Sequence, residues 1–309
     1  MTKILIELPT WLGDAIMTTP AIENIVNHLN EVEISLLGSA ISIGALRNHP
    51  KVIKTYKHDK EFIFYYKTLK ELDEYDIFIS FRNSLRAKLA KLLISAKKKY
   101  QFDKHKFKNN HQVQRYNDFI NDCLDINLVP KNLILHNNIN KIKKKKKLLG
   151  INPGASYGSA KRWYPKKFAE VGYALSSEFD IIIFGGPREI DIADDIEHNL
   201  IKYGVNNYQN LASKTSISEL ILQVANLDLF ITGDSGPMHI AAAFEVPTVT
   251  IFGPTNYLET SQWMNSKSII VKKNLLCQPC MKRKCPLKHH NCMKMVEAAE
   301  VLEAVDSFI

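Results

Sequence analysis

Two successive runs of alternating strand and helix patterns constrain the fold of this chain of 309 residues. In each run, short apolar stretches typical of buried strands alternate with segments that repeat apolar residues at helical spacing. In the first run the predicted strands are 3–8, 33–38, 75–80 and 132–136, with a basic helix at 84–96. In the second they are 148–154, 179–186, 227–236 and 247–255, with helices at 166–177, 189–203 and up to Phe244. This order predicts an α/β fold of two Rossmann-like domains, each with a mainly parallel sheet and helices on both faces. The two domains are expected to face each other across a cleft, with ligands at the carboxyl ends of the strands.

A run of like charge separates the two patterns. The segment "NKIKKKKK" (140–147) has little apolar content and predicts a solvated linker, with a strand end at the surface or an anion-binding patch as the alternatives. The expected domains are therefore 1–147 and 148–309. The last segment, "MVEAAEVLEAVDSF", predicts an amphipathic helix that is a candidate to pack back on the first domain.

Charge is distributed unevenly along the chain. Residues 1–150 hold 26 Lys and Arg against 15 Asp and Glu, whereas residues 151–309 hold 15 against 17. The basic half suggests a polyanionic partner: nucleic acid, an anionic membrane surface or a phosphorylated acceptor. A general preference for lysine on solvated faces explains the same numbers equally well.

Composition and the pattern of apolar residues bear on the cellular location of the protein. No apolar run approaches the roughly 20 residues of a membrane span, and the amino terminus lacks the pattern of a signal peptide. Five cysteines, four of them between Cys277 and Cys292, do not resemble a disulfide framework spread over a secreted fold. A cytoplasmic location is expected.

The segment "TGDSGPMHIAAAF" (232–244) follows a predicted strand and opens a helix. Ser235 is a natural N-cap, Gly236 permits close approach of another group, and Pro237 suits a first helical turn. The unpaired N–H groups and the helix dipole favour an anion there. A protease nucleophile at Ser235 is excluded because its fold would be all-β. A capped helix with His239 satisfied by packing is the structural alternative.

Two further loops carry candidate residues. In "NPGASYGSAKRWYPKKFAEV" (152–171), small residues and Lys161 follow a strand and suit a phosphate. In "LPTWLGDAIMTTPAI" (8–22), Asp14 lies between a strand and a helix. Its carboxylate either caps the helix or accepts a proton from a hydroxyl during group transfer.

These motifs, together with "FGGPREID", resemble in order and spacing those of the ADP-heptose:lipopolysaccharide heptosyltransferases, glycosyltransferase family 9, and most closely the type II enzymes. The resemblance covers nearly the whole chain. It implies a GT-B fold and inverting transfer of a heptose from ADP-heptose to the inner core of lipopolysaccharide or lipooligosaccharide. The alternatives are the first rather than the second heptose, or another nucleotide sugar. A basic module that binds nucleic acid is a remote alternative, since the sequence contains no motif for binding RNA or DNA.

The resemblance also assigns residues. It implies that Asp14 is the catalytic base and that Lys161 holds the donor diphosphate. The implied donor site further comprises Thr10, Gly13, Ser156, Glu189, Asp234, Ser235, Gly236, Pro237, Met238 and His239. Arg82 and Arg86, beyond the strand 75–80, are the candidates to bind a phosphorylated, lipid-linked acceptor, with a solvated helix face as the alternative.

The implied partners are a nucleotide sugar, the lipid-linked core oligosaccharide and the cytoplasmic face of the inner membrane, which a peripheral protein would contact. We expect a monomer that binds no nucleic acid and needs no obligatory cofactor. The cluster Cys277, Cys280, Cys285 and Cys292 lies in "CQPCMKRKCPLKHHNC". Its spacing departs from standard zinc ribbons, so reduced thiols in a surface loop are favoured over structural zinc.

Overall fold

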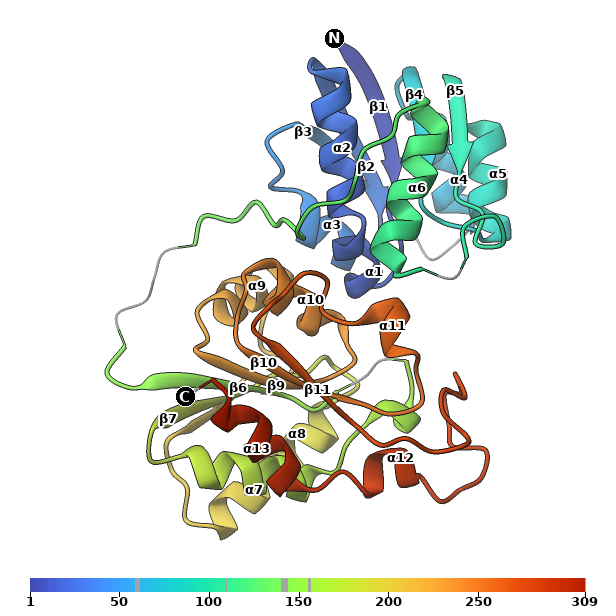
Figure 1. The fold of residues 1–309 in the computed structure, drawn as a ribbon. Helices are drawn as coiled ribbons and strands as arrows, with labels where there is room; N and C mark the ends of the chain where they lie inside the picture. Colours follow the sequence, from blue (N-terminus) through green and yellow to red (C-terminus); the bar gives the residue numbers. More distant parts are fainter. Residues whose placement is uncertain (59–61, 109, 140–143, 155–156, 309) are drawn as a thin grey trace. The chain divides into compact units, whose positions relative to one another are not determined.

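The computed structural model describes residues 1–58, 62–108, 110–139, 144–154 and 157–308, except for the side chains of 62–64. The chain forms two compact units, Met1–Asn137 and Asn138–Ile309, which we call unit 1 and unit 2 (Figure 1). Of the predicted linker 140–147, residues 140–143 lie outside the described residues, and Lys147 already opens the first strand of unit 2.

Unit 1 contains a five-stranded sheet of order β3-β2-β1-β4-β5. Its strands are β1 (Thr2–Glu7), β2 (Val32–Gly38), β3 (Val52–Lys57), β4 (Tyr75–Ser80) and β5 (Ala96–Gln101). Every neighbouring pair is parallel, as the alternation of strands and helices predicted. This is the strand order of a Rossmann-type sheet, and it brings the loops after β1 and β4 to one edge.

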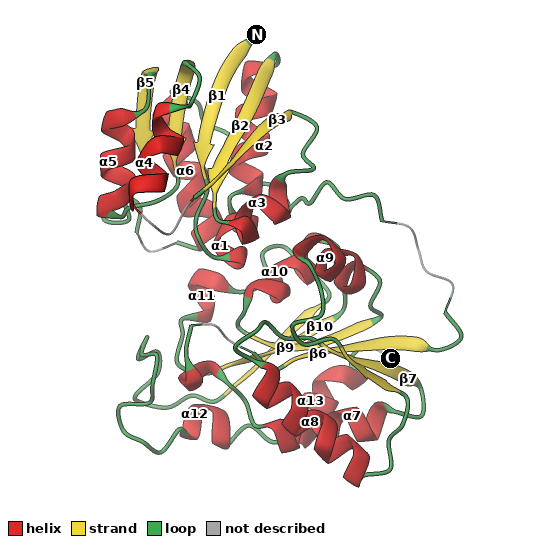
Figure 2. Ribbon diagram, turned by 180° about the vertical axis from the view of Figure 1, so that it is seen from behind, coloured by secondary structure: helices red, strands yellow, loops and turns green. Residues whose placement is uncertain are grey.

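Helices cover both faces of this sheet (Figure 2). They are α1 (Leu12–Met17), α2 (Thr19–Leu29), α3 (Ala40–Leu46), α4 (Phe62–Lys70), α5 (Leu85–Leu93) and α6 (Gln112–Leu124). Helices α2 and α6 pack against each other on one face. On the other face, α4 and α5 cover Leu5, Leu37 and Phe78, whose side chains point away from the α2 side because neighbours in a strand alternate.

Unit 2 contains a six-stranded sheet of order β11-β10-β9-β6-β7-β8. Its strands are β6 (Lys147–Asn152), β7 (Phe179–Ile183), β8 (Tyr208–Asn210), β9 (Leu229–Gly233), β10 (Thr248–Phe252) and β11 (Ser268–Lys272). All pairs are parallel. Counted from β6, the order is again that of a Rossmann sheet, so the loops after β6 and β9 lie side by side.

The main core of unit 2 lies between its sheet and three helices. The helices of unit 2 are α7 (Pro165–Leu175), α8 (Ile190–Lys202), α9 (Ile217–Ala225), α10 (Gly236–Ala243), α11 (Tyr257–Thr260), α12 (Asn291–Lys294) and α13 (Ala298–Asp306), with a 3-10 turn at Ser159–Lys161. Helices α7, α8 and α13 bury apolar residues against one face of the sheet, around Trp163 and Phe168. Helices α9 and α10 pack together above the other face (Figure 1).

The sequence predicted most of the central strands correctly, and one predicted strand is wrong. The strand 75–80 coincides with β4, and the other predicted strands except 132–136 overlap observed ones. The segment 132–136 is not a strand. Leu133 and Leu135 are buried, and the Ile134 N–H donates to Thr19 Oγ1 on α2 at 3.1 Å. Its alternating apolar residues reflect packing on a helix instead of pairing in a sheet. Among the described residues, none of the helices combines the length and the apolar composition that a membrane span requires.

Candidate active site

An ion pair joins two predicted donor residues at the carboxyl edge of the unit 2 sheet. Lys161 Nζ lies 2.6 Å from Asp234 Oδ2 and donates to the Asp234 carbonyl at 3.1 Å. Thr255, in the loop after β10, donates its hydroxyl to the same Oδ2 at 2.5 Å. Both charged side chains are largely buried, at 12% and 6% exposure. Asp234 therefore fixes the position of the ammonium group, and Thr255 fixes Asp234.

Helix α10 begins next to this pair. Ser235 occupies the N-cap position and Pro237 the first turn, as predicted. The Ser235 side chain makes no capping hydrogen bond to the helix. Its Oγ instead accepts from Asn152 Nδ2 at 3.0 Å and lies 3.2 Å from Thr232 Oγ1. Because the serine side chain is held from the sheet side, the positive end of the helix is left to attract an anion.

Of the remaining residues predicted in this segment, Gly236 is half-buried and Met238 and His239 are buried. Met238 N–H donates to the Ser235 carbonyl at 3.2 Å. These positions shape the first turn of α10 beneath the predicted anion.

The loop after β6 is braced by a distant part of the chain. Tyr157 donates its hydroxyl to the Met281 carbonyl at 2.7 Å, and its ring lies 4.8 Å from Lys161 Nζ. A Cβ at Gly158 would overlap the backbone of Arg283, so only glycine permits this approach. Ser156, predicted to contact the phosphates, lies outside the described residues.

Glu189 lies at the N-cap of α8, with 6% of the residue exposed. Its carboxylate accepts the Gly186 N–H at 2.7 Å. A Cβ at Gly154 would overlap that carboxylate. Glu189 thus connects the loops that follow β6 and β7 at the edge where Lys161 also lies.

In unit 1, the predicted base Asp14 lies in the first turn of α1, directly after the loop that follows β1. The residue is half-buried, Gly13 beside it is buried, and Thr10 is exposed. The Thr10 carbonyl accepts from Ser39 Oγ at 2.9 Å, which ties the loop to the start of α3. The carboxylate is therefore presented by the first turn of α1, which follows a short, anchored loop.

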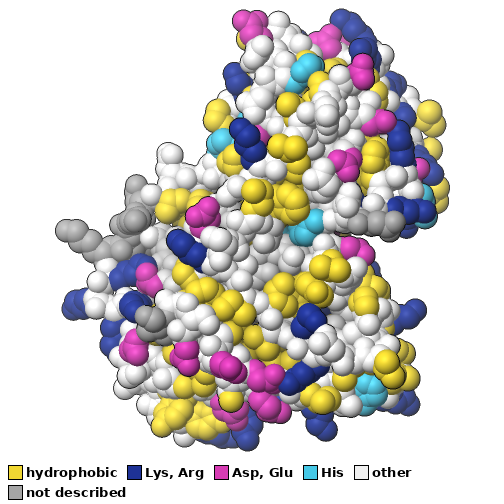
Figure 3. Space-filling view, in the orientation of Figure 1, with side chains coloured by type: hydrophobic (Ala, Val, Ile, Leu, Met, Phe, Trp, Pro, Cys, Tyr) yellow, Lys and Arg dark blue, Asp and Glu magenta, His cyan; other side chains and the backbone are white. Residues whose placement is uncertain are grey.

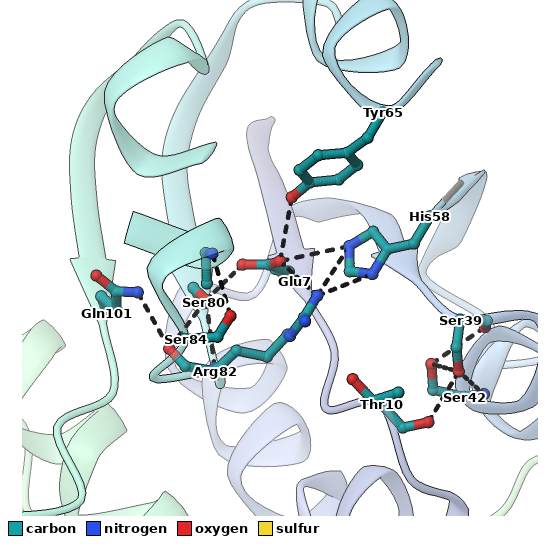
Figure 4. A network of polar contacts seen from close by, with 11 residues as sticks. Glu7, Thr10, Ser39, Ser42, His58, Tyr65, Ser80, Arg82, Ser84 and Gln101 are labelled. Carbon is teal, nitrogen blue, oxygen red and sulfur yellow. Dashed lines mark hydrogen bonds and ion pairs between the residues drawn. The ribbon is translucent and has the colours of Figure 1, made fainter. Parts of the chain in front are cut away.

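A buried carboxylate, Glu7, organises the neighbouring loop of unit 1 (Figure 4). It ends β1, is fully buried and lies 3.0 Å from Arg82 Nη1. Ser80 at the end of β4 donates its hydroxyl to Glu7 at 2.6 Å, and Tyr65 approaches at 3.4 Å. His58 Nδ1 lies 2.9 Å from the same Arg82 nitrogen. Residues of β1, β4, α4 and the loop after β3 thereby form the network that fixes the guanidinium predicted to bind the acceptor.

The charges in this network follow from its contacts. Burial alone would raise the pKa of Glu7, but hydrogen bonding to His58 and the charge of Arg82 outweigh it, so the pKa lies below its ordinary value. Burial lowers the pKa of His58. Neutral His58 accepts from Arg82 through Nδ1 and directs Nε2–H toward Glu7 Oε1, 3.3 Å away. The network at neutral pH is thus an Arg–Glu pair bridged by an uncharged imidazole.

Arg86, the second predicted acceptor residue, lies in the first turn of α5. Its guanidinium carbon is 3.8 Å from the centroid of the Tyr65 ring. A guanidinium lying over an aromatic face is attracted by the ring and held parallel to it. Tyr65 therefore contacts both the Glu7 network and Arg86, and it brings the two predicted arginines into one cluster.

Glu23, His49 and His136 form another polar cluster in unit 1, with donor atoms close enough together for a metal ion. His136 Nε2 and His49 Nε2 lie 2.8 and 3.2 Å from Glu23 Oε1. His49 Nδ1 accepts the Lys51 N–H at 3.1 Å, so the proton of a neutral His49 is on Nε2. A metal ion would have to displace that proton. The geometry instead suits a hydrogen-bonded clamp between α2 and the segment before the unit boundary.

The four clustered cysteines are all free thiols, and Cys292 is buried. Burial raises the pKa of Cys292 to about 11. Among the described residues, no three of these sulfur atoms come within 4.8 Å of one another. His290, in the same segment, lies 2.9 Å from the Ala160 carbonyl and 3.2 Å from the Tyr164 hydroxyl, so it braces the turn that carries Lys161.

Comparison with known proteins identifies the family of the chain. The family model of glycosyltransferase family 9 (heptosyltransferase) matches residues 66–291. The chain is 40% identical to lipooligosaccharide heptosyltransferase 2 of Campylobacter jejuni over 318 aligned positions, which cover 99% of this chain and 98% of the relative. The sequence-based family resemblance is thereby confirmed.

Solved structures show the same fold. Escherichia coli ADP-heptose lipopolysaccharide heptosyltransferase II matches with a TM-score of 0.81 at 21% identity, over 99% of this chain and 98% of that one. An E. coli heptosyltransferase solved with ADP matches with a TM-score of 0.78 at 15% identity, over 99% and 100%. The predicted α/β fold of two Rossmann-like units, of GT-B type, is confirmed. On this evidence the chain belongs to glycosyltransferase family 9, the heptosyltransferases, and is a glycosyltransferase.

Proposed function

We propose that this enzyme transfers a heptose from ADP-heptose to the inner core of lipopolysaccharide or lipooligosaccharide, and that it adds the second heptose. The family membership and the name of the 40% identical relative, a heptosyltransferase 2, support the reaction and the order of addition. The observation that carries the donor assignment is the buried Lys161 ammonium, held by Asp234 beside the start of α10. A cation and a helix N-terminus together suit a diphosphate.

The proposed donor site divides the work among its residues. Lys161 contacts the diphosphate, and the backbone at Ser235, Gly236 and Met238 offers it the positive end of α10. Asp234 bears a negative charge and acts by positioning Lys161. Glu189 is proposed to face the ribose, since a carboxylate accepts hydrogen bonds from sugar hydroxyls.

The proposed chemistry is one displacement at the anomeric carbon. The acceptor oxygen forms a bond to that carbon while the bond to the diphosphate oxygen breaks, and the electron pair leaves with ADP. Asp14 takes the proton of the acceptor hydroxyl as it attacks. Lys161 and α10 stabilise the negative charge that grows on the departing diphosphate, and this lowers the barrier most where that charge is largest.

The proposed acceptor is a phosphorylated, lipid-linked core oligosaccharide. Arg82 and Arg86 would bind its phosphates, because a guanidinium matches a phosphate with paired hydrogen bonds. We further propose that the protein works as a monomer at the cytoplasmic face of the inner membrane as a peripheral protein. Since Lys161 and α10 supply the positive charge that the leaving group needs, we propose that transfer requires no cofactor.

Calorimetric titration with ADP, UDP and GDP tests the donor assignment. Preference for ADP is expected, with affinity that falls in the Lys161→Ala variant. Clear preference for UDP or GDP would instead support transfer of a different sugar by the same fold.

A further inference from the structure

Helix α5 turns its leucines toward the outside and its alanines toward the core, the reverse of an ordinary surface helix. Leucines at positions 85, 89, 92 and 93 follow the i, i+4, i+7, i+8 spacing that normally turns toward a core. In this helix Ala87 and Ala90 are the fully buried residues. The leucines face outward with exposures of 80%, 45%, 75% and 45% in chain order. A contiguous exposed leucine face of this kind marks an interaction surface.

Basic residues surround the leucine face. Residues 82–108 hold ten Lys and Arg against a single Asp. Lys88 is exposed and Lys91 half-exposed on α5. On the neighbouring strand β5, Lys99 is half-exposed with its Nζ 3.5 Å from the Leu92 carbonyl of α5, and Lys97 is exposed and pairs with Asp76. Figure 3 shows dark blue and yellow side chains together along the edge of unit 1 where Figure 1 draws α5 and β5.

We propose that the exposed leucine face of α5, flanked by the lysines of α5 and β5, docks unit 1 onto an anionic lipid bilayer. A helix with leucines on one face and lysines beside them lies in the plane of the membrane interface, with its leucines among the acyl chains. The lysine stems extend along the apolar surface while their ammonium groups contact anionic headgroups. The local excess of positive charge favours this occupant over an uncharged protein surface.

Docking on a bilayer would also bring the enzyme to its lipid-linked acceptor, and this part of the inference rests on the proposed function. The Ser84 side chain caps α5 by accepting the Ala87 N–H at 3.2 Å, so Arg82 lies just before the helix and Arg86 in its first turn. When the leucines enter the bilayer, both arginines come to the level of the headgroups. Phosphates of a lipid-linked acceptor lie at that same level.

Flotation with lipid vesicles tests the proposal without any turnover. The full chain is mixed with vesicles of phosphatidylcholine alone or of phosphatidylcholine with phosphatidylglycerol. Binding is expected only to the anionic vesicles, and it should weaken as salt is added. The triple variant Leu85→Gln, Leu89→Gln, Leu92→Gln should partition at least about 50-fold more weakly, because its apolar face is gone.

A matched control separates this face from general hydrophobicity. Ile53 and Val129 are exposed aliphatic residues of the same unit, at 55% and 74%, and lie outside α5. The variant Ile53→Gln, Val129→Gln should bind vesicles as the wild type does. Both variants should keep the wild-type melting temperature, because the replaced side chains are exposed.

Three outcomes would overturn the proposal. One is a wild type that ignores anionic vesicles, and another is a triple variant that binds them unchanged. The third is a wild type that dimerises in sedimentation while the triple variant does not, which would assign the face to a second copy. None of them bears on which nucleotide the enzyme binds, so calorimetry with ADP judges the proposed function separately.

Discussion

Lys161 and Asp234 form a largely buried ion pair, with 2.6 Å between Nζ and Oδ2, at the start of helix α10. A bound diphosphate would share this ammonium group with the carboxylate. The carboxylate would therefore set where the lysine lies while it repels the ligand. Substitution of each residue can therefore distinguish the role of Lys161 from that of Asp234.

We expect Lys161→Ala to weaken ADP binding by about 10- to 100-fold, the range of a hydrogen bond to a charged group. The reason is twofold: the variant loses the cation and leaves the Asp234 carboxylate facing the ligand. Calorimetry measures the change. Lys166→Ala removes an exposed lysine from α7 and should leave ADP affinity unchanged.

The double variant Lys161→Ala, Asp234→Asn tests whether Asp234 acts only through the lysine. It should bind ADP at least as well as Lys161→Ala alone, since the repelling carboxylate is gone. A further loss of affinity in the double variant would mean that Asp234 itself contacts the ligand.

Glu7→Gln should destabilise unit 1 by roughly 3 kcal/mol, because it leaves the Arg82 guanidinium without its buried counter-ion. Chemical unfolding measures the loss. The KM for the acceptor should also rise, since Arg82 is no longer fixed. Asp73→Asn, which breaks the exposed pair with Lys54, is the control and should change neither quantity. An unaltered KM in a folded Glu7→Gln variant would refute a positioning role.

The pH dependence of stability should report on His58. Burial lowers its pKa in the folded protein, so between about pH 6.5 and that lowered value the unfolded chain binds a proton that the folded chain does not. Stability should therefore fall as pH drops through this range, by up to about 1.4 kcal/mol per pH unit. His58→Gln keeps an acceptor and a donor and should reduce this slope. An equal slope in both proteins would show that His58 does not titrate differently on folding.

Gly154→Ala should destabilise unit 2 by about 1–3 kcal/mol, because the new methyl group overlaps the Glu189 carboxylate. Gly186→Ala is a suitable control: its Cβ would lie 3.5 Å from the same carboxylate, an ordinary contact. Unfolding curves of the two variants should differ clearly. Equal stabilities would show that Glu189 moves aside without cost.

The sequence predicted those strands and helices whose own residues show a clear apolar pattern. Central strands such as β4 and β9 are short, mainly apolar and largely buried segments, and the sequence predicted their bounds to within a few residues. The edge strands β3 and β5 were not predicted. Strand β5, "AKKKYQ", is half-exposed and rich in lysine, and only pairing with β4 makes it a strand. Such pairing depends on residues far away in the chain.

In the candidate site, too, single residues could be predicted from local sequence, whereas contacts between distant residues could not. Lys161 and Asp234 were each singled out from their loops, but the ion pair between them spans 73 positions and has no local signature. Thr255 was missed for that reason. Glu7 was not predicted as a site residue, yet the fold surrounds it with Ser80, His58 and Arg82. Asn152 and Thr232 both lie within predicted strands, but only the pairing of β6 with β9 places them opposite each other.

Asp14→Asn tests the proposed base. Transfer should fall by about 10²- to 10⁴-fold, the usual contribution of a general base, while ADP affinity measured by calorimetry stays unchanged. Asp122→Asn, at an exposed pair with Lys106 in the same unit, should retain full activity. Retained turnover in Asp14→Asn would remove the assignment.

The central claim is tested most directly by incubating the purified protein with ADP-heptose and core acceptors that carry either no heptose or one. Mass spectrometry of the acceptor reads the result. The account predicts that the acceptor with one heptose gains the mass of a second, and that the acceptor without heptose stays unmodified. Transfer to the heptose-free acceptor alone would contradict the order of addition, and no transfer to either, with turnover of another nucleotide sugar, would contradict the proposed reaction itself.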